Sequence, residues 1–349
     1  MKKVDYIVVG LGIAGLCFTE RLKQHQKTFV VINKLPNAST AVSGGIINPT
    51  VLKRFTAAWQ AASFIDAAIP FYKRIETSLN EQLIVPMPIH RIFKNVEEQN
   101  NWMVASEKQG LKDFLVEEIQ TNNNESITAP MGMGEVKGGF SLRPAQLLQQ
   151  YANSFDKGDS LLEEHFDYDA LSISETSIQY QDIEARHIVF AEGSAGVQNP
   201  FFPKELLRPN KGEYVLFTSK ELQLFSVLKG PVMIIPLGDD VYKAGATFSR
   251  EDETTTTTET AKAEIVTKLK TMLQCDFEVI DQVAGIRPTV KDRRPLLGTS
   301  ADFNRIHFFN GLGTRGLMMA PGLSEVLYES IENNRTLPKE IDVKRFSNA

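Results

Sequence analysis

The stretch Asp5-Tyr-Ile-Val-Val-Gly-Leu-Gly-Ile-Ala-Gly15 decides the fold of this chain. An apolar run leads directly into the pattern Gly10-x-Gly12-x-x-Gly15, and a helical pattern follows. Gly10 permits a tight turn between strand and helix, Gly12 lets the backbone approach a pyrophosphate, and Gly15 lets the helix pack closely on the strand. The free N–H groups and the dipole at the start of that helix can then bind phosphates.

A second apolar strand supports this interpretation. Thr28-Phe-Val-Val-Ile32 follows an amphipathic helix predicted over Leu16 to Gln26, which completes a β-α-β unit. At the end of the second strand the fingerprint expects an acidic residue for a ribose, but this chain has Asn33 and then Lys34. The Asn33 amide can still hydrogen-bond a ribose hydroxyl, whereas Lys34 would also suit a 2′-phosphate. The motif therefore predicts a bound dinucleotide and leaves FAD and NADP open.

The composition is that of a large globular protein. With 349 residues, of which 42% are hydrophobic, the chain has room for two domains. The net charge is −5 and the longest basic cluster is Lys291-x-Arg293-Arg294, so the sequence does not indicate a nucleic-acid partner. The chain has only Cys17 and Cys275, with no CxxC pair, and this predicts a reduced, cytoplasmic protein.

Other sequence signals are absent. No apolar run reaches the roughly 18 residues of a membrane span, and we expect no signal peptide before the first strand. The five histidines are scattered without the spacing of metal ligands, so no metal site is predicted.

The middle of the chain adds a glycine-rich segment and a second group of strands. The stretch from Pro36 to Pro49 offers small residues close to a flat ligand, with Ser39, Thr40 and Ser43 available for phosphate or ribose, although an ordinary loop is the alternative. A helix is expected from Thr56 to Leu79, interrupted at Pro70, and a strand near Leu161 to Phe166. Alternating strands between residues 209 and 284 suggest a substrate-covering sheet. Within that region Thr256-x-x-Glu259 has the pattern of a capping box that opens a helix.

At this point the chain resembles the flavoproteins of the D-amino-acid oxidase type, which include glycine oxidase and sarcosine oxidase. The resemblance rests on landmarks that stand in the family's order along nearly the whole chain. They are the N-terminal fingerprint, Ser43-Gly-Gly-Ile-Ile-Asn-Pro49, Val189-Phe-Ala-Glu-Gly193, Lys211-Gly212, Gly245-Ala-Thr247, Ala284-Gly-Ile-Arg-Pro288 with Asp292 and Pro295, and Gly311-x-Gly-x-x-Gly316 with Ala320-Pro321. The resemblance implies FAD as the cofactor. Neither cysteine lies where covalently flavinylated relatives carry theirs, so we expect non-covalent FAD.

The resemblance also implies an α/β fold with two interleaved domains. A discontinuous, Rossmann-like FAD-binding domain is expected over residues 1–83, 141–208 and 286–349. An α+β substrate-binding domain, built on a mixed and largely antiparallel sheet, is expected over residues 84–140 and 209–285. The residues implied to contact FAD are Gly10, Gly12, Ile13, Ala14, Gly15, Asn33, Lys34, Thr40, Ser43, Gly44, Gly45, Ile46, Phe166, Ala191, Gly193, Gly285, Gly313, Thr314, Arg315, Gly316 and Leu317.

Two cations are the candidate catalytic residues. By resemblance, Arg287 binds the substrate carboxylate as a two-pronged ion pair, which a guanidinium suits better than an ammonium; a structural salt bridge is the alternative. Lys243 stands where sarcosine oxidase carries a lysine that activates oxygen, and a solvent-facing strand lysine is the alternative. Met233 replaces a substrate-contacting tyrosine of glycine oxidase, which suggests a larger or more apolar substrate unless it only fills the core. Arg54 is a further expected pocket residue, with its neighbour Lys53.

The activity implied is oxidation of the C–N bond of an amino acid or a related carboxylate-bearing amine. A hydride would pass to flavin N5, water would hydrolyse the resulting imine, and oxygen or a quinone would reoxidise the flavin. Alternatives are a flavin enzyme acting on a modified tRNA side group or on a 2-hydroxy acid, and a non-catalytic flavin-binding protein. An NADP-dependent reductase that uses Lys34 is a further alternative. The sequence predicts neither the substrate's identity nor the oligomeric state.

Overall fold

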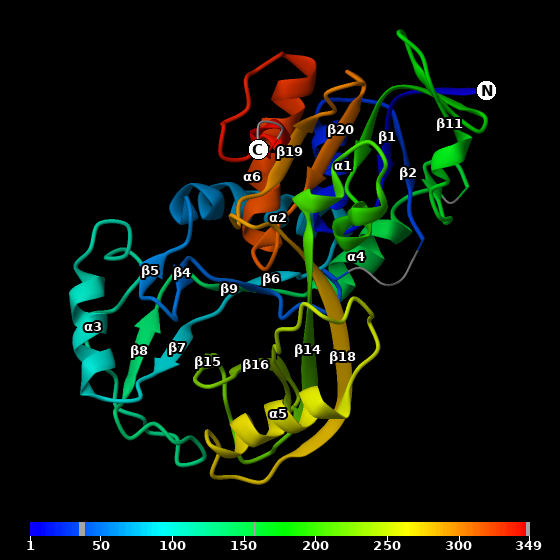
Figure 1. Ribbon diagram of the computed structural model, residues 1–349. Helices are drawn as coiled ribbons and strands as arrows, with labels where there is room; N and C mark the ends of the chain where they lie inside the picture. Colours follow the sequence, from blue (N-terminus) through cyan, green and yellow to red (C-terminus); the bar gives the residue numbers. More distant parts are fainter. Residues whose placement is uncertain (35–38, 157, 347–349) are drawn as a thin grey trace.

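The computed structural model describes residues 1–34, 39–156 and 158–346, so Pro36 and its two successors in the glycine-rich stretch lie outside it. Two large sheets occupy the two halves of the molecule (Figure 1). In the described residues the first sheet has eight strands in the order β10-β2-β1-β13-β12-β11, with β20 beside β13 and β19 beside β20. The second has seven, in the order β18-β14-β17-β16-β15-β7-β8.

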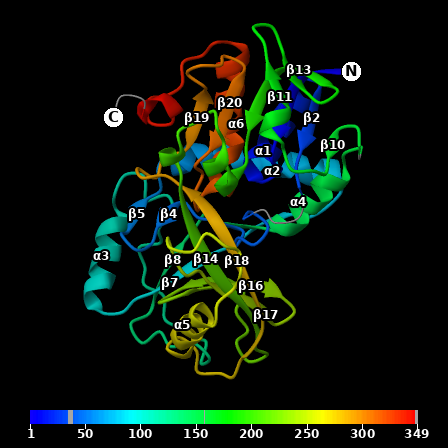
Figure 2. The same ribbon diagram turned by 45° about the vertical axis from the view of Figure 1, so that its right-hand side comes forward.

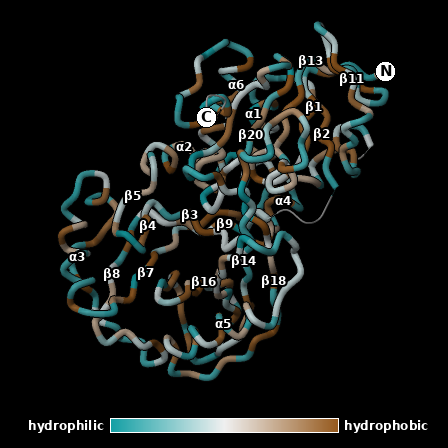
Figure 3. Tube along the Cα trace, viewed as in Figure 1, coloured by the Kyte–Doolittle hydropathy of each residue, from teal (hydrophilic) through white to brown (hydrophobic). Residues whose placement is uncertain are grey.

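The first sheet is a Rossmann-like parallel core with antiparallel strands added at its edges. Its parallel strands are β1 (Lys2–Val9), β2 (Phe29–Ile32), β10 (Leu161–Leu162), β13 (Ile183–Phe190) and β20 (Ile306–Asn310). The added strands are β11 (Leu171–Ile173), β12 (Ile178–Tyr180) and β19 (Leu296–Thr299). Tyr6, Ile7 and Val8 of the central strand are fully buried, as expected for a parallel strand covered on both faces. Figure 3 shows the strands of this sheet, coloured by hydropathy.

Helices from both ends of the chain cover this sheet. They are α1 (Ile13–Gln24), α2 (Ala61–Leu79), α4 (Pro144–Asn153) and α6 (Gly316–Glu332), and α6 packs against both α1 and α2. Their apolar faces join the strands in one buried cluster that includes Phe18, Phe71 and Leu327.

The second sheet is mixed and largely antiparallel, as predicted. Its strands are β7 (Ile89–Ile92), β8 (Met133–Val136), β14 (Arg208–Thr218), β15 (Val227–Lys229), β16 (Met233–Gly238), β17 (Val241–Gly245) and β18 (Glu278–Thr289), and only β7 and β15 pair in parallel. The helix α5 (Glu259–Lys270) packs on one face of this sheet, and α3 (Val96–Ser106) packs near β7 and β8.

The long strands β14 and β18 connect the two halves. They pair antiparallel over most of their length and run from the first sheet into the second (Figures 1 and 2). Near this crossing lies a small sheet of β3 (Ile46–Ile47), β9 (Phe140–Leu142) and β6 (Ile84–Pro86), while β4 (Thr50–Val51) pairs with β5 (Thr56–Ala57). The domain boundaries given above remain a prediction.

Some predicted elements differ in the structure. The helix predicted from Thr56 begins at Ala61 and is not interrupted at Pro70, which lies inside it. A proline removes one helical hydrogen bond, but Phe64, Ala68, Phe71 and other residues along the same helix are buried, and this packing offsets the loss. The strand near Leu161 ends at Leu162, so Phe166 lies in the loop that follows it.

The predicted capping box is wrong by two residues. The N-cap of α5 is Thr258, whose Oγ1 accepts from the N–H of Ala261 at 3.2 Å. The carboxylate of Glu213 fixes this residue, because it accepts from the N–H of Thr258 at 2.8 Å and from its hydroxyl at 2.9 Å. A contact between residues so far apart in the chain leaves no local sequence signal.

A histidine pair, His187 and the buried His307, joins β13 to β20. His187 Nδ1 lies 3.0 Å from His307 Nε2, and His307 Nδ1 lies 2.9 Å from Thr299 Oγ1. Burial lowers the pKa of His187 to about 4, and burial together with the charge of His187 holds the pKa of His307 well below its ordinary value. Both rings are therefore neutral in the folded protein near pH 7.

We expect the stability of the apoprotein to fall with pH below about 6.5. The unfolded chain takes up protons near the ordinary histidine pKa, whereas the folded pair does not, so stability is lost as pH falls from about 6.5 towards 4. The shift of His187 alone predicts a free energy of unfolding about 2 kcal/mol lower at pH 5 than at pH 7. Urea unfolding at both pH values measures this difference. Replacing both histidines by Gln should remove it, whereas the exposed His165→Gln should not.

Two features are absent from the described residues. Among the helices in that part of the chain, none is long and apolar enough to cross a membrane. The same residues contain no group of three or more His, Cys, Asp or Glu side chains placed to hold a metal ion. Cys17 is buried and Cys275 is partly buried, and both are free thiols.

Candidate active site

A cavity of about 1530 Å³ is lined by residues of both large sheets. Pockets for a single small molecule usually have volumes of roughly 300 to 1000 Å³, so this one has room for a cofactor and a substrate together. Most of the predicted FAD contacts line it. They are Gly10, Gly12, Ile13, Ala14, Asn33, Lys34, Thr40, Ser43, Gly44, Gly45, Ile46, Phe166, Ala191, Gly193, Gly285, Gly313, Thr314, Arg315, Gly316 and Leu317.

The three glycines of the N-terminal motif have different structural roles. Gly10 has φ +95°, and a Cβ there would lie 2.6 Å from the carbonyl oxygen of Ala191. A Cβ on Gly15 would lie 1.9 Å from the carbonyl oxygen of Gly10, so Gly15 supports the turn without lining the cavity. A Cβ on Gly12 would meet only Thr40 Oγ1, at 3.7 Å, and would otherwise project into open space. Gly12 therefore leaves the start of α1 open to a ligand.

Asn33 closes the glycine turn from the end of β2. Its Oδ1 accepts from the N–H of Leu11 at 2.8 Å, and the residue lines the cavity, so its side-chain NH₂ group can still donate to a ligand. The contact of Asn33 with a ribose remains a prediction, and the structure adds a second role for this residue that the sequence did not reveal.

The segment from Ser39 to Ile46 passes tightly between the two sheets. A Cβ on Gly44 would lie 2.5 Å from Ile235 Cδ1, and one on Gly45 would lie 2.1 Å from the carbonyl oxygen of Leu142. The hydroxyl oxygen of Ser43 is buried and has no hydrogen-bond partner in the described residues, yet Ser43 lines the cavity. Buried polar groups without partners are rare and costly, so this hydroxyl fits a site that is completed by a polar ligand such as FAD.

We expect Ser43→Ala to weaken FAD binding without destabilising the apoprotein. The substitution removes a hydroxyl that has no protein partner, whereas in the holoprotein it would remove about one hydrogen bond, worth roughly 0.5 to 1.5 kcal/mol or about 2- to 10-fold in Kd. Fluorescence titration with FAD and thermal unfolding of the apoprotein measure the two effects. The exposed Ser172→Ala on β11 is a matched control, and an unchanged FAD affinity in Ser43→Ala would contradict the assignment.

The C-terminal glycine segment meets the N-terminal one. Gly313 has φ +55°, and a Cβ on Gly316 would lie 2.9 Å from Ile13 Cγ2, so the N-termini of α1 and α6 converge on the cavity. Arg315 donates to the carbonyl oxygens of Asn48 at 2.7 Å and Thr50 at 2.9 Å, which ties this segment to β4. Helix N-termini favour negative charge, and two of them face one cavity.

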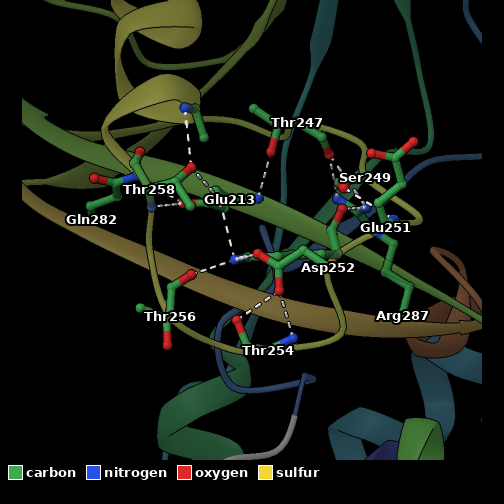
Figure 4. Close-up of polar contacts among 12 residues, drawn as sticks. Glu213, Thr247, Ser249, Glu251, Asp252, Thr254, Thr256, Thr258, Gln282 and Arg287 are labelled. Carbon is green, nitrogen blue, oxygen red and sulfur yellow. Dashed lines mark hydrogen bonds and ion pairs between the residues drawn. The ribbon is translucent and has the colours of Figure 1, made fainter.

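Arg287 lines the cavity from β18 (Figure 4). Its guanidinium donates to Asn210 Oδ1 at 2.8 Å and to the carbonyl oxygens of Lys211 at 3.3 Å and Thr247 at 3.4 Å. Gly212 makes room for it, because a Cβ there would lie 1.9 Å from Arg287 Nη2. All of these acceptors are neutral, and within the described ranges no carboxylate forms an ion pair with Arg287. Its positive charge is therefore available to an anionic ligand.

A buried charged network supports the acceptors of Arg287 (Figure 4). Lys211 is 1% exposed, and its Nζ lies 2.5 Å from Asp252 Oδ2 and 3.5 Å from Glu213 Oε1. The hydrogen bond from Lys211 is the main cause that lowers the pKa of Asp252 to about 2. Glu213 in turn accepts from Thr258 and from Gln282. Glu213 thereby fixes both ends of the segment from Thr247 to Thr258, since its own N–H donates to Thr247 Oγ1. The carbonyl of Thr247 is the one that contacts Arg287.

Lys243 lies behind the glycine-rich segment and does not line the cavity. Its Nζ donates to the carbonyl oxygens of Val42 at 3.1 Å and Ser43 at 3.2 Å, and it lies 5.3 Å from the centre of the Tyr214 ring. Burial lowers its pKa to about 8. The alternative of a solvent-facing lysine is wrong, since the residue is only 9% exposed. The role in oxygen activation stays a prediction.

The two predicted pocket residues differ in position. Met233 lines the cavity. Arg54 is exposed and does not line the cavity, but its neighbour Lys53 does.

Three residues of the site were not predicted from the sequence: Asn210, Tyr214 and Lys229. Asn210 binds Arg287, while Tyr214 and Lys229 line the cavity. Alternation along β14 and β15 could have indicated which residues share a face, but only the pairing of the strands shows that this face is the cavity wall.

Comparison with known proteins identifies the family. The family model described as "FAD dependent oxidoreductase" (DAO) matches residues 5–330. The chain belongs to this family. As a FAD-dependent oxidoreductase it uses FAD, so the choice between FAD and NADP that the N-terminal motif left open is decided for FAD.

Glycine oxidases are among the similar proteins. The enzyme of Bacillus subtilis is 29% identical over 160 residues, which cover 44% of this chain and 42% of that enzyme. The enzyme of Bacillus licheniformis is 22% identical over an alignment that covers 95% of this chain and 94% of the relative.

Solved structures show the same fold. Glycine oxidase from Bacillus cereus superposes with a TM-score of 0.79 at 16% identity, covering 95% of this chain and 96% of that one. Iminodiacetate oxidase from Chelativorans sp. superposes with a TM-score of 0.77 at 16% identity, covering 96% and 97%.

Proposed function

We propose that this FAD-dependent oxidoreductase oxidises the C–N bond of an amino acid or a related carboxylate-bearing amine. The observation that carries the proposal is the Arg287 guanidinium, which lines the cavity and contacts only neutral acceptors among the described residues. A guanidinium in this state recognises a carboxylate with two parallel hydrogen bonds. Relatives named glycine oxidase and iminodiacetate oxidase, which are named for carboxylate-bearing amines, support the substrate class.

The residues of the chain supply binding and orientation. Arg287 would hold the carboxylate, and Asn210 and the carbonyl of Thr247 would fix the plane of the guanidinium. When bound, FAD supplies the hydride acceptor for the α-carbon of the amine. The N-terminus of α6, which begins at Gly316, would favour negative charge at its end of the cavity. Positioning of this kind requires no dedicated protein base.

The electron acceptor of the second half-reaction is oxygen or a quinone in this proposal. Lys243 would act by holding the carbonyls of Val42 and Ser43, and so the shape of the glycine-rich segment that lines the cavity. Lys243→Met should therefore change FAD affinity as well as the rate of reoxidation. An unchanged FAD affinity with slowed reaction with oxygen would instead support the oxygen-activating role.

The test is an anaerobic titration of the FAD-loaded protein with D- and L-amino acids, N-methyl amino acids and 2-hydroxy acids. Bleaching of the flavin absorbance by a class of amines would support the proposal. Bleaching by 2-hydroxy acids alone would overturn the C–N assignment while keeping the carboxylate site. If no compound bleaches the flavin, a modified tRNA should be tried next, and failure there would favour a non-catalytic flavin-binding protein.

A further inference from the structure

A second cation, Lys229, lines the cavity from β15, which β16, β17 and β14 separate from the strand of Arg287, β18. Lys229 ends β15 and pairs with Met233 of β16, which pairs with Gly245 of β17. Leu228, Ile234 and Ala244 pack in the cluster under α5. Side chains alternate between the faces of a strand, so Lys229, Met233 and Gly245 share the opposite face. All three line the cavity, as Arg287 does.

The register gives the approximate spacing of the two cations. Neighbouring strands lie about 4.8 Å apart, so Lys229 is about 10 Å across the sheet from Gly245. Thr247, two residues beyond Gly245, carries the carbonyl that Arg287 contacts. In the strand order β18 lies two strands beyond β17, so the strand that carries Arg287 is farther from Lys229 than the strand that carries Gly245.

The amine of Lys229 lacks a partner. No described residue accepts a hydrogen bond from its Nζ or forms an ion pair with it, although the residue is only partly exposed. Burial, followed by the charges of Arg91, Lys268 and neighbouring lysines, lowers its pKa to about 8. An anion that binds beside Lys229 would therefore stabilise its ammonium form.

The charges around Lys229 leave an excess of positive charge at this end of the cavity. Arg91 is paired with Glu98 at 3.0 Å, and Lys268 with Glu264 at 2.5 Å. Lys53 lines the same cavity, and within the part of the chain that the structure describes it has no carboxylate partner. We call Lys229, Lys53 and Lys268 the Lys229 site.

We propose that the Lys229 site binds a second carboxylate of the substrate, so that the substrate is an elongated amine with one carboxylate at Arg287 and another at Lys229. This inference rests on the proposed function for the first carboxylate. Met233, which lies between the two cations on the same face, would contact the apolar chain that joins the two carboxylates.

Binding of unreactive acids to the FAD-loaded protein tests the proposal without turnover. Isothermal titration calorimetry would compare linear dicarboxylates from succinate to suberate with monocarboxylates of equal length. We expect the best dicarboxylate to bind at least 10-fold more tightly than its monocarboxylate partner, with an optimum chain length. Lys229→Met should reduce this preference to less than 3-fold, and Lys229→Arg should retain most of it. The exposed Lys220→Met is the matched control and should leave the preference unchanged.

The outcomes separate this inference from the proposed function. Equal binding of mono- and dicarboxylates by the unaltered protein would overturn the inference even if Lys229→Met fails to fold, as would equal effects of Lys229→Met and Lys220→Met. If dicarboxylates bind through Lys229 but no amine bleaches the flavin, the second carboxylate site is supported and the proposed reaction is overturned. If simple amino acids bleach the flavin with no preference for a second carboxylate, the proposed reaction is supported and the second carboxylate site is overturned.

Discussion

Replacing Arg287 by Ala is expected to raise the KM for a carboxylate-bearing amine by about 10²- to 10³-fold. Removing one partner of a hydrogen-bonded charge pair typically costs about 2 to 5 kcal/mol, and each 1.4 kcal/mol is a factor of ten in affinity. Asn210, Lys211 and Thr247 hold the guanidinium through neutral oxygens, and the ammonium of Lys211 is itself paired with Asp252. Steady-state kinetics of the variant measure the change.

Two further variants make this test specific. Arg287→Lys keeps the charge but loses the planar fork, so its KM should lie between those of the unaltered protein and Arg287→Ala. Arg208→Ala removes an exposed arginine from the partner strand and should change KM less than 2-fold. If Arg287→Ala retains its FAD and its KM does not change, Arg287 does not bind the substrate carboxylate.

Gly12→Ala is expected to weaken FAD binding by 100-fold or more while the apoprotein stays folded. The added Cβ would meet only Thr40 Oγ1, at 3.7 Å, so nothing in the protein resists it. It would, however, fill the space beside the backbone of the turn that a bound pyrophosphate needs. Fluorescence titration with FAD and thermal unfolding of the apoprotein measure the two quantities separately.

Gly15→Ala should behave differently and serves as the comparison. Its Cβ would lie 1.9 Å from the carbonyl oxygen of Gly10, so the turn must distort and the apoprotein should lose stability as well as FAD. If Gly12→Ala bound FAD normally, the pyrophosphate would lie elsewhere in the cavity. If both variants lost stability equally, Gly12 would have a structural role only.

The sequence allowed prediction of the features that depend on local pattern. The glycine turn needs particular residues at fixed spacing, and the apolar runs of β1 and β2 are long enough to identify without a structure. The orientation of Arg287 was not predictable from the sequence. Asn210 contacts it because β14 pairs with β18, and Thr247 contacts it from the segment that follows β17. Thr258 was not predicted as the N-cap of α5 for the same reason, since Glu213 of β14 fixes it through a contact between segments distant in the chain.

Lys243 and Lys229 illustrate the limit of such reasoning most clearly. Each ends or lies within a short strand, and nothing in the neighbouring residues distinguishes them from surface lysines. Their environments come from segments far away in the chain: Val42 and Ser43 for Lys243, and Lys53, Arg91 and Lys268 for Lys229. Burial that is created by tertiary packing leaves no periodic signal in the sequence.

The placement of β1 between β2 and β13, with β20 on the far side of β13, sets an order of events during synthesis. The strands β1, β2, β10 and β13 can pair once residue 190 has been made, whereas β20 and the contact between Ile13 and Gly316 require residues from 306 to 316. Until then β13 lacks one neighbour, and the C-terminal glycine segment is missing from the cavity wall. We expect FAD to be captured late, so ribosome-bound chains stalled before residue 306 should retain none, and retention by such chains would show that the early segments form the nucleotide site alone.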